Sequence, residues 1–182
     1  MNESGLPVAS VLVLGGARSG KSSYAEARAS SFEEVTYVAT GVNHDGDKDW
    51  QERIAAHRAR RPSHWKLIET LDLPGALNSA HGVVLIDCLT LWLTSVLDEL
   101  QAWVEPRSAW GPSLDKKIAE FLVAIVGHDV LLVSNEIGFG VHPETSSGRL
   151  FRDELGRLNA QVASVCTEVV LVVAGIPMKL KG

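Results

Sequence analysis

The sequence predicts a three-layer α/β fold, in which helices cover both faces of a mostly parallel β-sheet. Along its 182 residues, short apolar runs rich in Val, Leu and Ile alternate with longer segments of helical character. Consecutive parallel strands need crossover connections, and right-handed crossovers place helices on the faces of the sheet. The runs that we predict to be buried strands are residues 11–14, 35–39, 83–86, 130–133 and 169–173.

The segments with helical character lie between these runs, at residues 22–30, 49–60, 89–100, 114–126 and 149–165. Residues 102–113 are predicted to be an irregular excursion between two helices that contains Pro106 and Pro112. Trp103 and Trp110 lie in the same excursion and could pack against a neighbouring subunit or against the core. We favour the core, because aromatic side chains more often serve packing.

The composition predicts one globular domain over residues 1–182, since 46% hydrophobic and 21% charged residues suit a single core. A net charge of −5 argues against nonspecific binding to nucleic acid, which needs Lys and Arg to neutralise phosphates. Cys88 and Cys166 lie in or beside apolar runs and are predicted to be free, buried thiols. The sequence shows no signal peptide and no membrane-spanning run, so we expect a cytoplasmic protein.

The segment GGARSGKS follows the first predicted strand directly and has the spacing of a phosphate-binding P-loop. Its glycines allow backbone N–H groups to approach phosphate oxygens, and the helix that starts there points its positive end at the anion. Lys21 would neutralise the β- and γ-phosphates, and the Ser22 hydroxyl would bind Mg²⁺. The alternative, a Gly/Ser-rich turn that arises by chance, does not account for the strand-to-helix context. The predicted phosphate-binding residues are Gly15, Gly16, Ala17, Arg18, Ser19, Gly20, Lys21 and Ser22.

Two further acidic positions follow predicted strands, where ligands of parallel sheets gather. Asp87 is placed to hold Mg²⁺ directly or through water, or alternatively to cap the helix that starts at Leu89. Glu136 could act as a base and Asn135 could contact substrate. The same pair could instead hydrogen-bond the backbone of its own loop.

A basic cluster around a histidine stands out in this acidic chain. On a helix, His57 would share a face with Arg53 and with Arg60 or Arg61. Neighbouring cations favour the neutral form of an imidazole, which can attack phosphorus while guanidinium groups bind the displaced phosphates. The alternative is a solvated helix whose arginines pair with preceding acidic residues.

Together these signals resemble the bifunctional adenosylcobinamide kinase/adenosylcobinamide-phosphate guanylyltransferase family of cobalamin assembly. The resemblance covers nearly the whole chain, and its most specific block is the His/Arg/Pro/Trp/Glu arrangement between Arg53 and Glu69. The other matching segments are GGARSGKS at 15–22, YVAT at 37–40, NEIGFG at 135–140, PE at 143–144, FRD at 151–153 and GRLN at 156–159. The architecture that the resemblance implies is a RecA-like P-loop NTPase.

The resemblance implies two reactions on one scaffold. Adenosylcobinamide is phosphorylated by a nucleoside triphosphate, and GMP is then transferred from GTP to give adenosylcobinamide-GDP and pyrophosphate. His57 would be the nucleophile that carries GMP, and Ser22 and Asp87 would hold Mg²⁺. GTP and ATP would be substrates, and the protein would be a homotrimer. Beyond the P-loop, the nucleotide-binding residues would be Thr40, Gly41, Val42, Arg58, Ala59, Arg60, Arg61, Glu69 and Asp87.

Two alternatives remain at the level of sequence. The first is a small-molecule kinase without nucleotidyl transfer, in which Glu136 or Asp87 serves as the base and His57 is structural. The second is a GTP-binding assembly factor with little turnover of its own.

Overall fold

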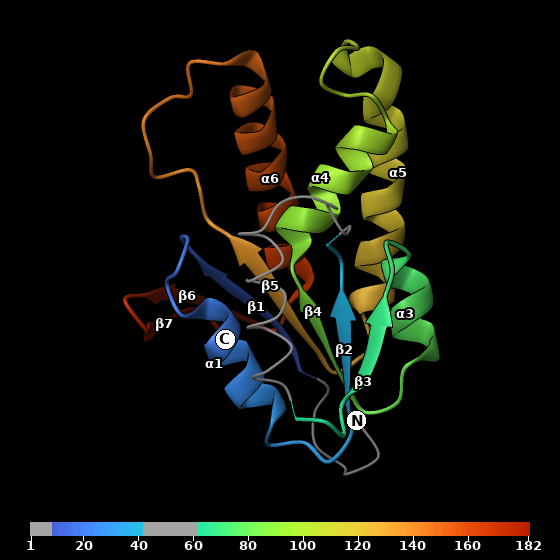
Figure 1. Cartoon of the computed structure of the whole chain (residues 1–182), viewed down its shortest axis with the longest axis vertical. Coiled ribbons are helices and arrows are strands. Elements are labelled where there is room, and N and C mark those ends of the chain that lie inside the picture. The colour runs from blue at the N-terminus through green and yellow to red at the C-terminus, as the bar shows by residue number, and fades with distance from the viewer. Residues whose placement is uncertain (1–8, 42–61) are drawn as a thin grey trace.

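The computed structural model describes residues 9–41 and 62–182. In this part of the chain, one seven-stranded sheet has the order β3-β2-β4-β5-β1-β6-β7, and Figure 1 shows it with most of its strands pointing upward. Neighbouring strands are parallel except β6 and β7, which form an antiparallel hairpin. The predicted, mostly parallel sheet is therefore confirmed. The strands are β1 Ser10–Gly15, β2 Val35–Ala39, β3 Lys66–Glu69, β4 Val83–Asp87, β5 Val130–Asn135, β6 Glu168–Val173 and β7 Ile176–Lys181.

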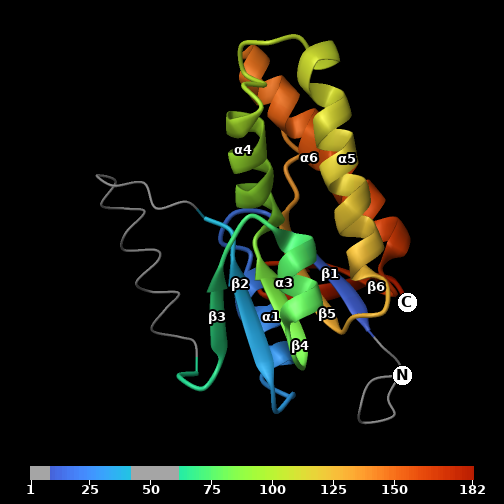
Figure 2. The same ribbon diagram turned by 90° about the vertical axis from the view of Figure 1, so that its right-hand side faces the viewer.

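Helices lie on both faces of this sheet, as Figure 2 shows from the side. Residues of α1 belong to the buried cluster on one face, and residues of α3, α4, α5 and α6 belong to the cluster on the other. The described helices are α1 Lys21–Ala29, α3 Leu73–Ser79, α4 Leu89–Glu99, α5 Arg107–Ile125 and α6 Ser146–Val165. The predicted helix at residues 49–60 lies outside the described residues.

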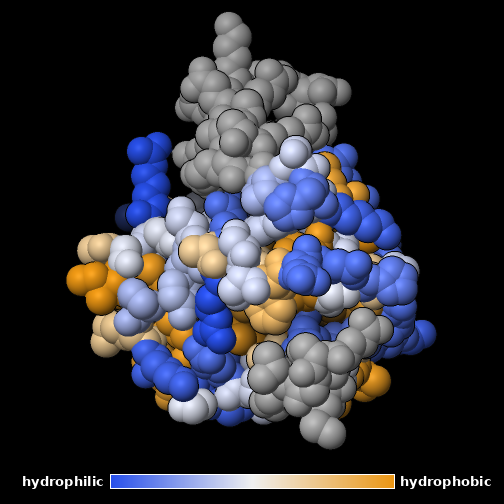
Figure 3. All heavy atoms as spheres, turned by 90° about the horizontal axis from the view of Figure 1, so that it is seen from below, coloured by the Kyte–Doolittle hydropathy of each residue, from blue (hydrophilic) through white to orange (hydrophobic). Residues whose placement is uncertain are grey.

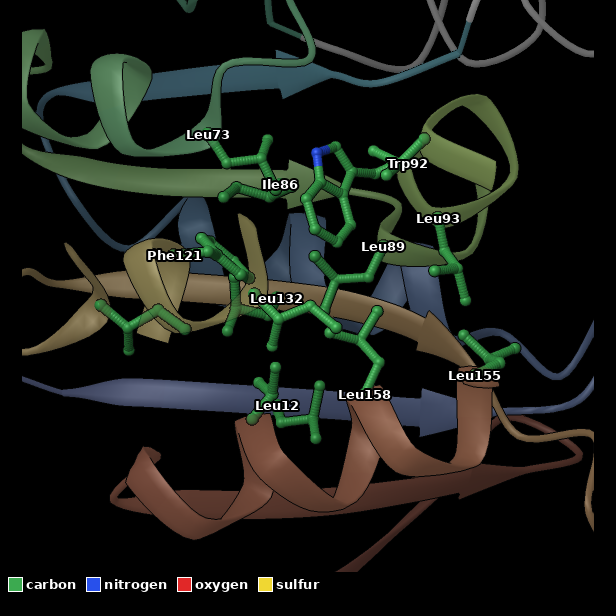
Figure 4. Packing of buried hydrophobic residues seen from close by; sticks show 14 of the residues in the cluster. Leu12, Leu73, Ile86, Leu89, Trp92, Leu93, Phe121, Leu132, Leu155 and Leu158 are labelled. Atoms are coloured by element: carbon green, nitrogen blue, oxygen red, sulfur yellow. The ribbon is translucent and has the colours of Figure 1, made fainter. Parts of the chain in front are cut away.

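The larger core lies between the sheet and helices α3 to α6 (Figure 4). Phe121 of α5 is fully buried, and its ring centroid lies 5.8 Å from that of Trp92 in α4. Leu12 and Leu132 supply the sheet side of this layer, and Leu158 supplies α6. Burial of each such side chain stabilises the fold by about 1.5–3 kcal/mol, so this layer fixes where the helices stand above the strands.

The predicted irregular excursion at residues 102–113 is wrong for its second half. Helix α5 begins at Arg107 and includes Pro112. Trp110 anchors this first part of the helix, because its indole is buried, its Nε1 donates to the Glu105 carbonyl at 3.0 Å, and the Arg107 guanidinium lies 5.6 Å from its ring. The prediction that Trp110 packs into the core is confirmed.

Three short elements were not predicted, namely β3, α3 and β7. Strand β3 exposes three of its four residues, and every residue of β7 is exposed. Strand β7 presents Ile176, Met178 and Leu180 at the edge of the sheet. This edge lies at the left of Figure 1, and hydrophobic groups gather at the left of the view from below in Figure 3. This exposed edge is available for contact with another chain.

The two cysteines behave as predicted. Cys88 and Cys166 are free and buried, and burial raises the pKa of each thiol to about 11. Among the described residues, no helix is long and apolar enough to cross a membrane.

A bidentate ion pair joins α1 to the start of β6. Arg28 Nη1 donates to Glu168 Oε1 at 2.6 Å, and Arg28 Nη2 donates to Glu168 Oε2 at 3.0 Å. These hydrogen bonds hold the pKa of the Glu168 carboxyl below its usual value. Because the folded-state pKa is lowered, the stabilisation is present above the unfolded-state pKa and is lost as the pH falls through the folded-state value.

We therefore expect Glu168→Gln to lower the free energy of unfolding at pH 7 by about 1 kcal/mol, with the deficit shrinking under acidic conditions. Urea unfolding at pH 7 and at about pH 3 measures both values, well on either side of the ordinary Glu pKa of about 4.3. The control is Glu120→Gln, which removes an exposed carboxylate 3.9 Å from Lys116. A deficit that does not change with pH would contradict the assigned role of the carboxylate.

Candidate nucleotide-binding site

The carboxyl ends of the parallel strands form the edge at which the predicted site residues gather. The predicted P-loop connects β1 to α1 at this edge (Figure 1). Gly15 ends β1 and is in register with Asn135 of β5 on one side and with Val172 of β6 on the other. The loop therefore starts in the interior of the sheet, between two strands that fix its root.

Close packing explains the glycines at both ends of the loop. A Cβ on Gly15 would lie 2.7 Å from the Val172 carbonyl oxygen, and a Cβ on Gly20 would lie 3.2 Å from Gly175 Cα. Gly20 also has a φ of +93°, which L-residues other than glycine rarely adopt. The Gly175 N–H donates to the Ser19 carbonyl at 2.8 Å. The turn between β6 and β7 thus braces the P-loop from behind.

The amino end of α1 is arranged to receive an anion. Its N-cap is Gly20, which has no side chain, so the first N–H groups of the helix receive no side-chain cap in the described part of the chain. The Ser19 hydroxyl, which belongs to a residue only 9% exposed, is buried without a hydrogen-bond partner among the described residues. Uncapped N–H groups at the positive end of a helix form a phosphate-binding site.

Lys21 lies over this loop. Its Nζ donates to the Gly16 carbonyl at 3.1 Å. Burial lowers the pKa of the Lys21 ammonium, while Cys88 and Asp87 nearby raise it. The lysine is thus held between the P-loop and the end of β4, as expected for a side chain that would contact phosphates at this edge.

Strands β3, β2 and β4 bring two carboxylates to the same edge. Ala39, at the end of β2, is in register with Glu69 of β3 and with Asp87 of β4. Asp87 Oδ2 accepts a hydrogen bond from the Tyr37 hydroxyl at 3.1 Å. Since neighbouring strands lie about 4.8 Å apart, the Cα atoms of Glu69 and Asp87 are separated by about twice that spacing.

Asp87 does not cap α4. The N-cap of that helix is Cys88, and its side chain makes no capping hydrogen bond. The carboxylate of Asp87 projects instead toward Tyr37, which belongs to the buried cluster on the α1 face. The capping alternative for Asp87 is therefore wrong.

Thr40, which follows β2, hydrogen-bonds the backbone of Cys88, which follows β4. Its buried hydroxyl donates to the Cys88 carbonyl at 2.6 Å and accepts the Cys88 N–H at 3.1 Å. Because both hydrogen-bonding functions of this hydroxyl are engaged, a nucleotide contact at Thr40 or Gly41 would use the backbone.

Glu136 hydrogen-bonds the backbone of its own loop, which was the alternative to a role as a base. Its Oε1 accepts the N–H of Gly138 at 2.6 Å.

Several predicted site residues lie outside the described part of the chain. They are Val42, His57, Arg58, Ala59, Arg60 and Arg61. The structure brings together the P-loop, Thr40, Gly41, Glu69 and Asp87 at one edge.

Two contributors to this edge were missed by sequence reasoning, namely Tyr37 and the turn at Gly175. Tyr37 shows no signal in the sequence for its contact with Asp87, which lies 50 residues away. The Ala174-Gly175 pair between two apolar runs is a turn signal that could have revealed the hairpin.

A magnesium ion at this edge would need oxygen ligands. Among the described residues, no group of three or more His, Cys, Asp or Glu side chains could hold a metal. The donors that the chain offers, the Ser22 hydroxyl and the Asp87 carboxylate, suit Mg²⁺, which is usually bound through one or two carboxylates, water and substrate phosphates. The residues therefore fit a magnesium ion that arrives with a nucleotide.

A family model described as cobinamide kinase/cobinamide phosphate guanyltransferase matches residues 11–180. The chain belongs to this family. It is therefore a transferase with the kinase and guanyltransferase chemistry of cobalamin biosynthesis that defines the family.

Two relatives from this family match the chain over nearly their full length. The bifunctional adenosylcobalamin biosynthesis protein CobP of Pseudomonas aeruginosa is 44% identical over 94% of this chain and 96% of its own length. The protein CobU of Escherichia coli is 36% identical over 94% of this chain and 99% of its own length.

The fold comparison agrees with the predicted RecA-like, three-layer architecture. A solved ATPase from the type III secretion system of pathogenic bacteria matches with a TM-score of 0.58 and 11% identity. The match covers 94% of this chain and 56% of that ATPase chain. At this identity the likeness concerns the fold alone.

Proposed function

We propose that residues 1–182 act as one catalytic domain that performs both family reactions at the carboxyl edge of its sheet. In the first, a nucleoside triphosphate phosphorylates the hydroxyl of adenosylcobinamide. In the second, GMP passes from GTP to adenosylcobinamide phosphate through a guanylyl group on His57. The P-loop carries this proposal, because its root packs against β6, its Lys21 ammonium lies within electrostatic reach of Asp87, and the chain matches the family over residues 11–180.

The P-loop supports the binding of the triphosphate. Uncapped N–H groups at the start of α1 and the ammonium of Lys21 would hold phosphate oxygens in the fixed positions that phosphoryl transfer requires. Mg²⁺ would be held by Ser22 and Asp87 and would neutralise charge on the phosphates. Thr40, Gly41, Val42, Glu69 and the segment Arg58, Ala59, Arg60 and Arg61 would complete the site for GTP.

The guanylyl transfer would proceed in two successive displacements at the α-phosphorus of GTP. A lone pair of the neutral His57 imidazole attacks the α-phosphorus, an N–P bond forms, and the P–O bond to pyrophosphate breaks. A phosphate oxygen of adenosylcobinamide phosphate then attacks the same phosphorus and the N–P bond breaks, which releases adenosylcobinamide-GDP. A histidine nucleophile divides one difficult displacement into two easier ones.

We also propose that the protein works in the cytoplasm as a homotrimer. The hydrophobic groups that β7 exposes, Ile176, Met178 and Leu180, support a contact between copies. Light scattering of the purified protein measures the assembly state directly.

Product analysis tests the proposed function. The purified protein is incubated with adenosylcobinamide, Mg²⁺ and either ATP or GTP, and the corrinoid products are separated and weighed by mass spectrometry. We expect adenosylcobinamide phosphate with ATP, and adenosylcobinamide-GDP together with pyrophosphate when GTP is present. Phosphorylated corrinoid without any GDP derivative would indicate a plain kinase, and no corrinoid product at all would indicate a GTP-binding assembly factor.

A further inference from the structure

Asn135 ends β5 directly beside the root of the P-loop. It is in register with Gly15 across the pair of parallel strands. The next residue, Glu136, donates its N–H to the Gly15 carbonyl at 3.1 Å. Lys21, which reaches β- and γ-phosphates in P-loops, has its ammonium on the carbonyl of Gly16. Asn135 therefore stands next to the phosphate end of the site.

The alternation of side chains along β5 shows which face Asn135 occupies. Val133 packs into the cluster on the α1 face, and Ser134 points the other way, toward α6. Successive side chains of a strand point to opposite faces, so Asn135 projects on the α1 face. The same reasoning applies to β4, where Leu85 belongs to the α1-face cluster and Asp87 follows two residues later. Asp87, which is in register with Val133, therefore shares this face with Asn135.

Two buried side chains, Asn159 and Thr90, hold the backbone of Asn135 from the other side, and a third, Ser134, holds Asn159. Asn159 Nδ2 donates to the Asn135 carbonyl at 2.9 Å, and Asn159 Oδ1 accepts the Ser134 hydroxyl at 2.7 Å. The Asn135 N–H donates to Thr90 Oγ1 at 2.9 Å. Thr90, Ser134 and Asn159 are all buried. A satisfied polar network of this kind rigidifies the end of a strand.

The side-chain amide of Asn135 takes no part in this network. It is half-buried, and it makes no hydrogen bond to another described residue. A fixed backbone with an unengaged amide beside a phosphate site is the arrangement of a preorganised ligand contact.

We propose that the Asn135 amide donates a hydrogen bond to the terminal phosphate of the bound nucleoside triphosphate, and that Asn159 is the positioning residue that holds it there. The inference rests on the proposed function, because it assumes that a triphosphate occupies the P-loop. Its consequence is selectivity. The contact strengthens the binding of a triphosphate and leaves that of a diphosphate nearly unchanged.

The test compares affinities for the β,γ-imido analogue of GTP and for GDP, measured by calorimetry with Mg²⁺ in the full-length protein. We expect Asn135→Ala to weaken binding of the triphosphate analogue about tenfold and that of GDP less than about twofold. Asn159→Asp keeps an acceptor for Ser134 but places an oxygen against the Asn135 carbonyl, and we expect it to reduce the same ratio. The control Asn78→Ala changes an exposed residue of α3 and should alter neither affinity.

Equal weakening of both ligands by Asn135→Ala, or no weakening of either, overturns the inference. Thermal unfolding of each variant shows whether the fold is kept, and Asn135→Ala leaves all three buried side chains of the network in place. The product analysis of the unaltered protein reports separately on the proposed function. A protein that makes both corrinoid products while Asn135→Ala keeps the full preference for triphosphate loses this inference alone.

Discussion

Replacing Lys21 with alanine is expected to lower the rates of both corrinoid reactions by about a hundred- to a thousandfold while leaving the fold intact. The ammonium of Lys21 is a cation that the structure holds over the P-loop, through the Gly16 carbonyl and beside Asp87. Each reaction breaks a phosphate bond of a triphosphate bound at this loop, so both lose the charge that stabilises the phosphates. Initial rates of adenosylcobinamide phosphate and adenosylcobinamide-GDP formation measure the effect.

The control for this variant is Lys116→Ala, because Lys116 is a largely exposed lysine of α5 far along the chain from the loop. Its rates should match those of the unaltered protein. If Lys21→Ala formed either product at more than about a tenth of the normal rate, the proposed role of the P-loop lysine in phosphate transfer would be wrong.

Burial also lowers the pKa of Lys21. Nucleotide affinity should therefore begin to decline at a lower pH than it would with an exposed lysine.

Replacing His57 with asparagine is expected to separate the two reactions. Loss of the nucleophile should reduce guanylyl transfer by at least about a thousandfold, whereas phosphorylation of adenosylcobinamide does not use the imidazole and should continue. Adenosylcobinamide phosphate should then accumulate in the presence of GTP. Chromatography of the corrinoids over time measures both species in one reaction.

A matched control is His64→Asn, which changes an exposed histidine seven residues further along. It should support both reactions at normal rates. If His57→Asn still produced adenosylcobinamide-GDP at a rate close to that of the His64 variant, the nucleophile would have to be another group.

The sheet could be predicted where strands are buried on both faces, because such strands are continuous apolar runs. Strand β3 escaped prediction since Lys66 and Glu69 flank only two apolar residues and most of the strand is exposed. Strand β7 contains Pro177 and is exposed throughout, which removes the pattern of a buried run. The start of α5 escaped because Pro112 suggests a break, whereas burial of Trp110 stabilises the helix around it.

The candidate site also has a part that could be predicted from the sequence and a part that could not. The P-loop is local in sequence and carries its own signal, so its glycines, Lys21 and Ser22 could be predicted together. The contacts that brace it are distant in sequence: Gly175 lies against Ser19 and Gly20, and Asn159 holds the carbonyl of Asn135. Pairings of this kind depend on the order of strands in the sheet, which a single sequence does not state.

The covalent intermediate is the most direct test of the central claim that one chain joins a P-loop to a histidine nucleophile. The protein is incubated with Mg²⁺ and GTP labelled at the α-phosphorus, precipitated, and digested for peptide mapping. We expect one equivalent of label or less per chain, labile in acid, stable in base, located at His57 and discharged by adenosylcobinamide phosphate. Absence of label on a protein that nevertheless forms adenosylcobinamide-GDP, or label that persists in His57→Asn, would contradict it.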